Sequence, residues 1–325
     1  MNAYFKQIIS IHLYTFWLLI ISRTIQTMQL LTPTGWDNYE LLDSGDFEKL
    51  ERFGKYITIR PEPQALWDKA LSPQEWERMA HVRFVSKSSS AGEWKKLKEM
   101  PDQWKISYTL SGNAPWKKGE HPQIAFRLGL TSFKHVGIFP EQAVNWEYIY
   151  STITSMKTAN PKFLNLFAYT GGASLAAKAA GADVTHVDSI KQVVTWAKEN
   201  MEASELDNIR WVVEDALKFV KREEKRGNKY NGIILDPPAF GHGPNGEKWK
   251  LEDNISEMIK SVLNLLDEQE HFLILNAYSL GFSSIIIENL LKGKAGKNLE
   301  TGELYLLSKT ANKLPLGVFG RFKNF

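Results

Sequence analysis

Five short apolar segments alternate with helical segments in the second half of the chain, and this alternation limits the possible folds most strongly. The spacing predicts strands at 162–167, 183–188, 209–213, 232–235 and 272–276. Helices are predicted at 142–156, 172–180, 191–203, 216–226, 254–267 and 282–291. Strands that alternate with helices at this spacing form a parallel sheet covered on both faces. Ligands bind to such sheets beyond the carboxyl ends of the strands.

The segment before this alternation has a different character. Three runs of alternating apolar and polar residues predict strands at 56–60, 104–110 and 124–130, with turn residues between them. We therefore expect a small β-rich domain over 28–138, followed by an α/β domain over 139–325.

The first 27 residues contain a mostly apolar run of 14 residues, from Ile8 to Ile21. This run is too short for a comfortable membrane span, and no small-x-small cleavage pattern follows it. Three interpretations are a membrane segment, a signal peptide, and a spurious or dispensable extension ahead of a functional chain that begins at Met28. We favour the third, and expect no membrane association.

Composition narrows the chemistry further. The chain of 325 residues has no cysteine, which excludes disulfides and cysteine-ligated metal and agrees with a reducing, cytoplasmic location. Its net charge is only +3, but residues 81–140 contain ten Lys or Arg against four Asp or Glu. These basic residues are interleaved with Trp94, Trp104, Trp116 and Phe126. Such a window suits contact with phosphates and bases, and it suits equally a solvated face over core tryptophans.

Glycines and carboxylates follow successive predicted strands. Gly171 and Gly172 come after the first strand, Asp188 ends the second, Asp215 follows the third and Asp236 follows the fourth. Paired glycines let a ligand approach the backbone, and an acidic residue at the end of a second strand accepts from ribose hydroxyls. Helix packing would also explain the glycines, and helix capping the first two aspartates. The coincidence of all four favours a nucleotide-like ligand.

The fourth strand leads into Asp236-Pro237-Pro238-Ala239-Phe240. Two prolines stiffen the turn, whose carbonyls can accept from an amino group, and the aromatic ring offers a stacking face. The following segment, 241–249, reads as a flexible loop in which His242, Lys248 and Trp249 could contact a substrate. Residues 276–279 at the end of the fifth strand could line the same site.

Taken in order, NLFAYTGG (165–172), HVD (186–188), VVEDA (212–216) and DPPAF (236–240) resemble class I S-adenosylmethionine-dependent methyltransferases. The resemblance runs from about 139 to 325 and includes the bacterial large-subunit rRNA methyltransferases of the I and K/L types. It implies a Rossmann-like seven-stranded sheet and S-adenosyl-L-methionine as cofactor, with no metal. The implied cofactor contacts are Thr170, Gly171, Gly172, Asp188 and Asp215. Asn165 would support the glycine loop, and Gln142 would seat the methionine part of the cofactor.

The resemblance also bears on the acceptor. Some members methylate carbon 5 of cytosine, which needs a cysteine thiolate that this chain does not have. We therefore expect transfer to a base nitrogen of RNA, with guanine and rRNA favoured. Asp236 and the Pro237 carbonyl would hold the nucleophile, and Phe240 would stack on the base. The alternatives are a protein or small-molecule acceptor, and a non-catalytic RNA-binding protein with a degenerate pocket. A nicotinamide dehydrogenase is disfavoured because G-x-G-x-x-G is missing.

Overall fold

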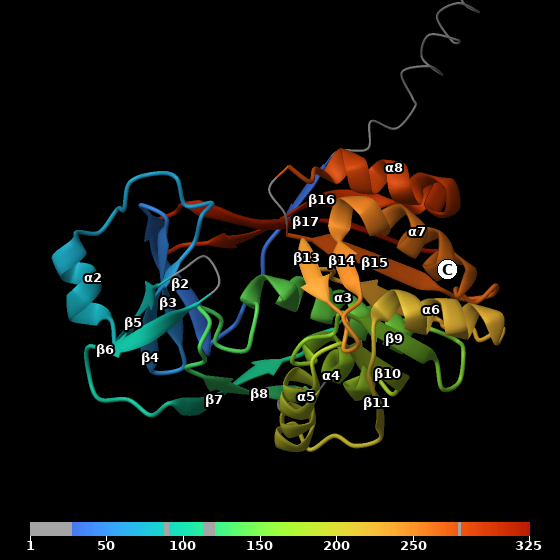
Figure 1. The fold of residues 1–325 in the computed structure, drawn as a ribbon, viewed down its shortest axis with the longest axis horizontal. Coiled ribbons are helices and arrows are strands. Elements are labelled where there is room, and N and C mark those ends of the chain that lie inside the picture. Colours follow the sequence, from blue (N-terminus) through green and yellow to red (C-terminus); the bar gives the residue numbers. More distant parts are fainter. Residues whose placement is uncertain (1–27, 88–90, 113–120, 279–280) are drawn as a thin grey trace, which may run out of the picture.

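A computed structural model describes residues 28–87, 91–112, 121–278 and 281–325 (Figure 1). The apolar run 8–21 and Trp116, Lys117, Lys118 and Ser279 lie outside these residues. A β-rich part lies beside a larger part in which helices flank a sheet. No helix within the described ranges is long and apolar enough to cross a lipid bilayer.

The larger part contains an eight-stranded sheet in the order β1-β16-β17-β15-β12-β9-β10-β11. Seven of these strands form the predicted methyltransferase-type sheet, and β1 (Gln29–Leu31) adds an eighth, parallel to β16 at the edge. β15, β12, β9, β10 and β11 are parallel neighbours, whereas β17 is antiparallel to both β15 and β16. The other strands are β9 (Lys162–Leu166), β10 (Asp183–Asp188), β11 (Ile209–Val213), β12 (Gly232–Leu235), β15 (Phe272–Ala277), β16 (Glu300–Leu307) and β17 (Lys313–Lys323).

Both faces of this sheet are covered, as predicted. Phe163, Ile234 and Phe272 belong to a core that includes α3 and α4, whereas Leu164 and Leu273 belong to a core with α6, α7 and α8. Neighbouring residues along a strand point to opposite faces, so this division follows directly from the strand period. The helices are α3 (Ala143–Ser155), α4 (Gly172–Ala179), α5 (Lys191–Ala203), α6 (Ala216–Lys225), α7 (Leu251–Asn264) and α8 (Ser284–Ala295).

The β-rich part contains a five-stranded sheet, β2-β3-β4-β5-β6, the pair β7-β8, and the short helix α2 (Pro73–Met79). The three predicted strands here are confirmed as β4 (Tyr56–Pro61), β7 (Gln103–Thr109) and β8 (Gln123–Gly129). Sequence patterns missed β2 (Tyr39–Gly45), β3 (Glu48–Phe53), β5 (Val82–Ser86) and β6 (Gly92–Lys96). β2 and β3 were not predicted because they lack the alternation of apolar and polar residues that indicates a half-buried strand. Their polar residues Asp43, Lys49 and Glu51 are buried too.

The two parts are in direct contact. The turn between β16 and β17 reaches the first strand of the β-rich sheet, where Lys309 N donates to Leu41 O at 2.9 Å. The ring of Trp36 meets Trp146 of α3 with centroids 5.8 Å apart, within one continuous hydrophobic core. The division into 28–138 and 139–325 stays a prediction, and β1 belongs to the main sheet although it precedes the β-rich strands.

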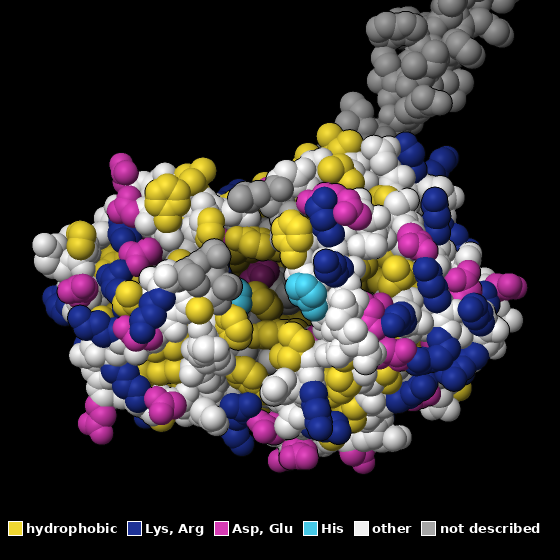
Figure 2. All heavy atoms as spheres, in the orientation of Figure 1, with side chains coloured by type: hydrophobic (Ala, Val, Ile, Leu, Met, Phe, Trp, Pro, Cys, Tyr) yellow, Lys and Arg dark blue, Asp and Glu magenta, His cyan; other side chains and the backbone are white. Residues whose placement is uncertain are grey.

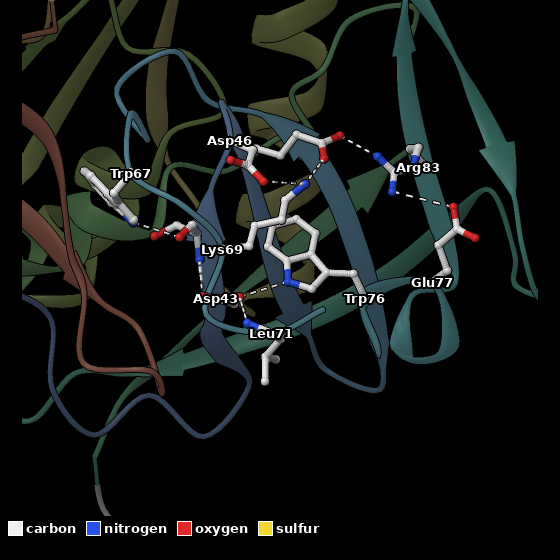
Figure 3. Close-up of polar contacts among 10 residues, drawn as sticks. Asp43, Asp46, Trp67, Lys69, Leu71, Trp76, Glu77 and Arg83 are labelled. Atoms are coloured by element: carbon white, nitrogen blue, oxygen red, sulfur yellow. Dashed lines mark hydrogen bonds and ion pairs between the residues drawn. The ribbon is translucent and has the colours of Figure 1, made fainter. Parts of the chain in front are cut away.

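Asp43 organises the contact between the parts. One oxygen of its carboxylate accepts from Ser44 N at 2.9 Å and Thr310 Oγ1 at 2.8 Å. The other accepts from Leu71 N and Trp76 Nε1, both at 2.9 Å (Figure 3). The Asp43 side chain thus joins β2, α2 and the β16–β17 turn, and it is fully buried.

Charged side chains continue this network around Trp76. Lys69 Nζ lies 4.4 Å from the centre of the Trp76 ring and 2.6 Å from Glu48 Oε2. Arg83 also pairs with Glu48, and Trp67 Nε1 donates to Ser44 O at 2.7 Å. Figure 3 shows these side chains converging from the strands and from the long connection between β4 and α2.

Replacing Asp43 with alanine should lower the free energy of unfolding by about 3 to 4 kcal/mol, because four donors lose their acceptor and two of them, Ser44 N and Trp76 Nε1, are buried. Chemical denaturation of both proteins measures the difference. Glu77→Ala is the matched control, since the Glu77 side chain is 64% exposed and 3.8 Å from Arg83, and should change stability by less than about 0.5 kcal/mol. Equal losses of stability in Asp43→Ala and Glu77→Ala would contradict the role of the Asp43 carboxylate in holding the two parts together.

Candidate functional site

The loops that follow β12, β9, β10 and β11 meet at one edge of the sheet, because these strands are parallel neighbours. A cavity of about 430 Å³, partly open to solvent, lies at this edge. Its lining includes six of the predicted site residues: Gln142, Asn165, Thr170, Gly171, Gly172 and Asp236. The remaining lining is largely apolar or aromatic: Phe126, Ile138, Phe139, Trp146, Phe167, Ala168, Tyr169, Ala173 and Ile234. Figure 2 shows a hollow between the β-rich part and the main sheet, with hydrophobic side chains around it and an acidic side chain inside.

The loop after β9 has an unusual backbone. Phe167 and Tyr169 adopt positive φ values of 56° and 48°, and Gly171 follows at 91°. Positive φ costs a non-glycine residue about 1 to 3 kcal/mol and concentrates at ligand sites. Thr170 fixes the loop on both sides: its Oγ1 donates to Gly137 O at 2.7 Å, and its carbonyl accepts from Asn200 Nδ2 at 2.9 Å. The strained backbone is therefore held in place facing the cavity.

Gly172 begins α4 directly against a tryptophan. A Cβ atom built at this position would lie 2.6 Å from Trp146 Cε2 and 2.7 Å from its Nε1. Trp146 is itself buried and stacks on Phe126 with centroids 5.1 Å apart. Gly172 is therefore required by close packing, and the amino end of α4 is pressed against the cavity wall. The packing interpretation of this glycine is thus realised, and its contact with a ligand stays a prediction.

Asp188 and Asp215 do not line the cavity. Asp188 accepts from Tyr169 N at 2.9 Å and from Ile190 N at 3.0 Å, so it fastens the strained loop to β10. Burial raises the pKa of Asp188, against the opposing effect of these backbone N–H groups. Asp215 caps α6 by accepting from Lys218 N at 2.9 Å. The capping alternative is thus realised for Asp215, and contact of either aspartate with a cofactor stays a prediction.

Asp236 stands at one end of the cavity between two side-chain amides. Asn276 Nδ2 donates to its Oδ1 and Gln142 Nε2 to its Oδ2, both at 3.1 Å. Asn145 Nδ2 in turn donates to Gln142 Oε1 at 2.8 Å. Gln142 was predicted to seat a cofactor, and the structure adds a contact with Asp236. Sequence reasoning did not identify Asn145, although its position three residues after Gln142 places both on one helical face.

Two carboxyl groups have raised pKa values here: Asp236, which is half-buried and lines the cavity, and Glu141, which does not line it. Burial raises the pKa of Asp236 to about 6, although the Asn276 amide opposes the shift. Glu141, next to Gln142, is buried, and burial raises its pKa to about 7 against the opposing charge of Lys49. The Asp236 charge contributes to this shift in Glu141. Glu141 gave no sequence signal, because a lone glutamate before a helix ordinarily faces solvent.

These shifts predict how stability depends on pH. A raised pKa means that the folded state binds the proton more tightly, so stability falls as pH rises from about 4 through 6. Asp236→Asn removes the charge and should stabilise the protein by about 1 kcal/mol at pH 8, after allowance for one weakened hydrogen bond. At pH 4 Asp236 is protonated in the folded wild type, so this gain in stability should be nearly absent. Thermal unfolding of both proteins at pH 4 and pH 8 measures the difference in stability between the variant and wild type. If that difference favoured the variant less at pH 8 than at pH 4, the prediction would be contradicted.

The segment after the Asp-Pro-Pro turn corrects the prediction of a plain flexible loop. β13 (Phe240–His242) and β14 (Lys248–Lys250) form an antiparallel hairpin. Trp249 is buried, and its Nε1 donates to Pro238 O at 2.7 Å, so it stabilises the turn and is not free for substrate. Phe240 is 68% exposed outside the cavity. Pro237 is buried and does not line the cavity.

In the basic and aromatic window, the aromatic residues that can be placed pack in or against the core, and contact with RNA stays a prediction. Trp104 and Phe126 are buried in the core, and Trp94 Nε1 donates to Thr131 O at 2.7 Å. Lys96 pairs with Asp102 at 2.7 Å, and Lys98 donates to carbonyls at the end of α2. In the described ranges, no group of three or more His, Asp or Glu could hold a metal ion.

Comparisons with known proteins identify the class of enzyme to which the chain is similar. The family model described as "Conserved hypothetical protein 95" matches residues 130–269. The ribosomal RNA large subunit methyltransferase K/L of Shewanella frigidimarina is 30% identical over 155 residues, which is 46% of this chain and 21% of that protein. Its counterpart in Pseudoalteromonas translucida is 33% identical over 120 residues, 36% of this chain and 16% of that protein. The chain thus matches about a fifth of the length of these curated relatives.

Solved structures match over nearly the whole chain. SMU.776, complexed with SAH, shares the fold at 20% identity and a TM-score of 0.63, over 88% of this chain and 75% of that one. The SAM-dependent methyltransferase from Agrobacterium tumefaciens is 36% identical, with a TM-score of 0.81, over 91% of this chain and 93% of that one. A relative this similar over more than nine-tenths of each chain shows that the chain belongs to the S-adenosylmethionine-dependent methyltransferases.

Proposed function

We propose that this enzyme transfers a methyl group to a base nitrogen of RNA, with rRNA as the favoured RNA, guanine as the favoured base and the cytoplasm as the location. The observation that carries the proposal is the Asp236 carboxylate, held between the amides of Gln142 and Asn276 at the end of the cavity. The names of the K/L relatives support an rRNA acceptor.

The cavity suits S-adenosylmethionine. Thr170, Gly171 and Gly172 present backbone at the amino end of α4, Phe139 and Tyr169 present aromatic surface, and Gln142 presents an amide. We propose these residues as the cofactor contacts, with Asn165 behind them: its Nδ2 donates to Ser174 Oγ of α4 at 2.9 Å. When bound, the cofactor supplies an electrophilic methyl group on a sulfonium.

The residues at the acceptor end are suited to hold an amino group. Asp236 is an acceptor for an N–H of the incoming base, which orients the nitrogen lone pair for in-line attack. The nitrogen gains the methyl carbon, the carbon–sulfur bond breaks, and the nitrogen then releases one proton to the Asp236 carboxylate or to water. The Pro237 carbonyl is the second proposed acceptor, and Phe240 the proposed stacking surface.

One more polar atom near Asp236 favours a methylated group that carries several N–H donors. Asn276 Oδ1 is buried and has no hydrogen-bond partner within the described residues. A buried carbonyl oxygen without a partner costs about 1 to 3 kcal/mol, and a ligand or water that donates to it recovers this energy. We propose Asn276 Oδ1 and Asp236 as the two hydrogen-bond acceptors for the amino and ring N–H groups of guanine: Asp236 lines the cavity, and Asn276 is hydrogen-bonded to it.

The test begins with calorimetric titration of the protein with S-adenosylmethionine and S-adenosylhomocysteine. Transfer of a tritiated methyl group to total RNA, total protein and small-molecule extracts is then measured separately, using extracts from cells that lack this chain. We expect micromolar cofactor binding and label in RNA, and nuclease digestion followed by chromatography would identify the base. Label confined to protein or small molecules would overturn the RNA assignment, and absence of cofactor binding would overturn the cofactor contacts.

A further inference from the structure

Tyr278 joins the acceptor end of the cavity to the β-rich part of the molecule. It follows directly after β15, two residues beyond Asn276, whose amide holds Asp236. The residue is 40% exposed, yet its hydroxyl donates to Glu62 Oε1 at 2.7 Å, across 216 positions of sequence. The ring is therefore accessible while its far end is fixed by the β-rich part.

The anchor of Tyr278 is itself tightly held. Glu62 is 3% exposed, and its second oxygen, Oε2, lies 3.1 Å from Lys49 Nζ, which is 8% exposed on β3. Burial opposes ionisation of Glu62, but Lys49 and the Tyr278 hydroxyl outweigh it and lower the pKa of Glu62. A buried ion pair adds little stability compared with apolar packing. We therefore attribute to the Lys49–Glu62 pair the role of holding a carboxylate oxygen in place for the Tyr278 hydroxyl.

The exposed ring of Tyr278 has a counterpart on the neighbouring strand. β12 and β15 are paired in parallel with Leu235 opposite Leu275, so Asp236, directly after β12, lies beside Asn276 of β15. Phe240 follows Asp236 by four residues and is 68% exposed. Exposed aromatic side chains therefore follow both residues of the Asp236–Asn276 pair, two positions after Asn276 and four after Asp236.

We propose that the Tyr278 ring is a contact surface for a flat heteroaromatic acceptor, and that Glu62, held by Lys49, positions it. This inference rests on the proposed function and deepens it, because it makes the β-rich part a component of the acceptor site. Aromatic rings select planar groups with an accessible π face. A flexible aliphatic amine gains little from such a surface.

Kinetics of methyl transfer to total RNA from cells that lack this chain test the proposal. Tyr278→Leu keeps apolar bulk but removes the ring, and should lower kcat/KM for RNA roughly tenfold to a hundredfold. Tyr278→Phe keeps the ring but releases its hydroxyl from Glu62, and should lower kcat/KM roughly threefold to tenfold. In both variants the Kd for S-adenosylhomocysteine should stay within about twofold of wild type. Phe325→Leu, at an aromatic residue 37% exposed near the chain end, is the matched control.

A double-mutant cycle separates positioning from general structural damage. If Glu62 acts through the Tyr278 hydroxyl, Glu62→Gln and Tyr278→Phe together should lower kcat/KM no more than the larger single effect. Thermal unfolding shows whether Glu62→Gln folds. If this variant does not fold, Tyr278→Phe still tests the proposal, because it leaves the Lys49–Glu62 pair intact.

The possible outcomes distinguish this inference from the proposed function. If wild type methylates RNA and Tyr278→Leu retains full kcat/KM, the inference is wrong and the proposed function stands. If a flat heterocyclic small molecule is the acceptor, the RNA assignment fails, and the same variants decide the inference on that acceptor. If the acceptor is an aliphatic amine of a protein, both are overturned.

Discussion

Asp236→Ala is expected to lower the rate of methyl transfer to RNA by roughly a hundredfold to a thousandfold or more, which is typical for loss of a polar group at the reacting atoms. Asp236 accepts from Asn276 and Gln142 on one side and faces the cavity on the other. Its removal would leave the incoming nitrogen without its orienting acceptor. Single-turnover transfer of the tritiated methyl group at saturating cofactor measures this step directly.

Cofactor affinity is the control for this variant. The glycine loop is fastened by Thr170, Asn200 and Asp188 and does not depend on Asp236, so the Kd for S-adenosylhomocysteine should change by less than about fivefold. Asp253→Ala, at an exposed aspartate paired with Lys250 at 3.2 Å, should leave both quantities unchanged. Full activity in Asp236→Ala would remove Asp236 from the acceptor site.

Gly172→Ala should weaken cofactor binding by roughly a hundredfold and lower the free energy of unfolding by about 2 kcal/mol. The new methyl group would lie 2.6 Å from the Trp146 ring, which is far inside van der Waals contact. Trp146 has little freedom to move, because Phe126, Trp36 and Tyr108 all pack against it. The amino end of α4 must therefore shift relative to the cavity. Calorimetric titration and chemical denaturation measure the two effects.

Gly293→Ala is the matched control for this substitution. Gly293 lies within α8, with ordinary backbone and no atom within 4 Å of an added Cβ. Alanine there should keep cofactor affinity and raise stability by about 0.5 to 1 kcal/mol, since glycine is the poorer helix former. If Gly172→Ala bound cofactor as tightly as Gly293→Ala, close packing at α4 would not govern the site.

The sequence alone determined the architecture and the edge of the sheet that carries the site. Mostly apolar runs that alternate with helical segments identified β9, β10, β11, β12 and β15, because parallel strands covered on both faces are rich in apolar residues. The glycine pair and Asp236 were identified from their position after strands, since chain order fixes which strand ends carry them. The absence of cysteine likewise excluded one reaction without any structure.

Only the tertiary structure decided which side chains meet at that edge. Gln142 and Asn276 reach Asp236 from positions 94 and 40 residues away, and Tyr278 reaches Glu62 across 216. The tertiary structure also decided that Trp249 is buried and that Lys49 and Glu62 form a buried pair. Local patterns report the free energy of burying apolar surface along one element, whereas the partner of a buried polar group is set by packing between elements distant in sequence.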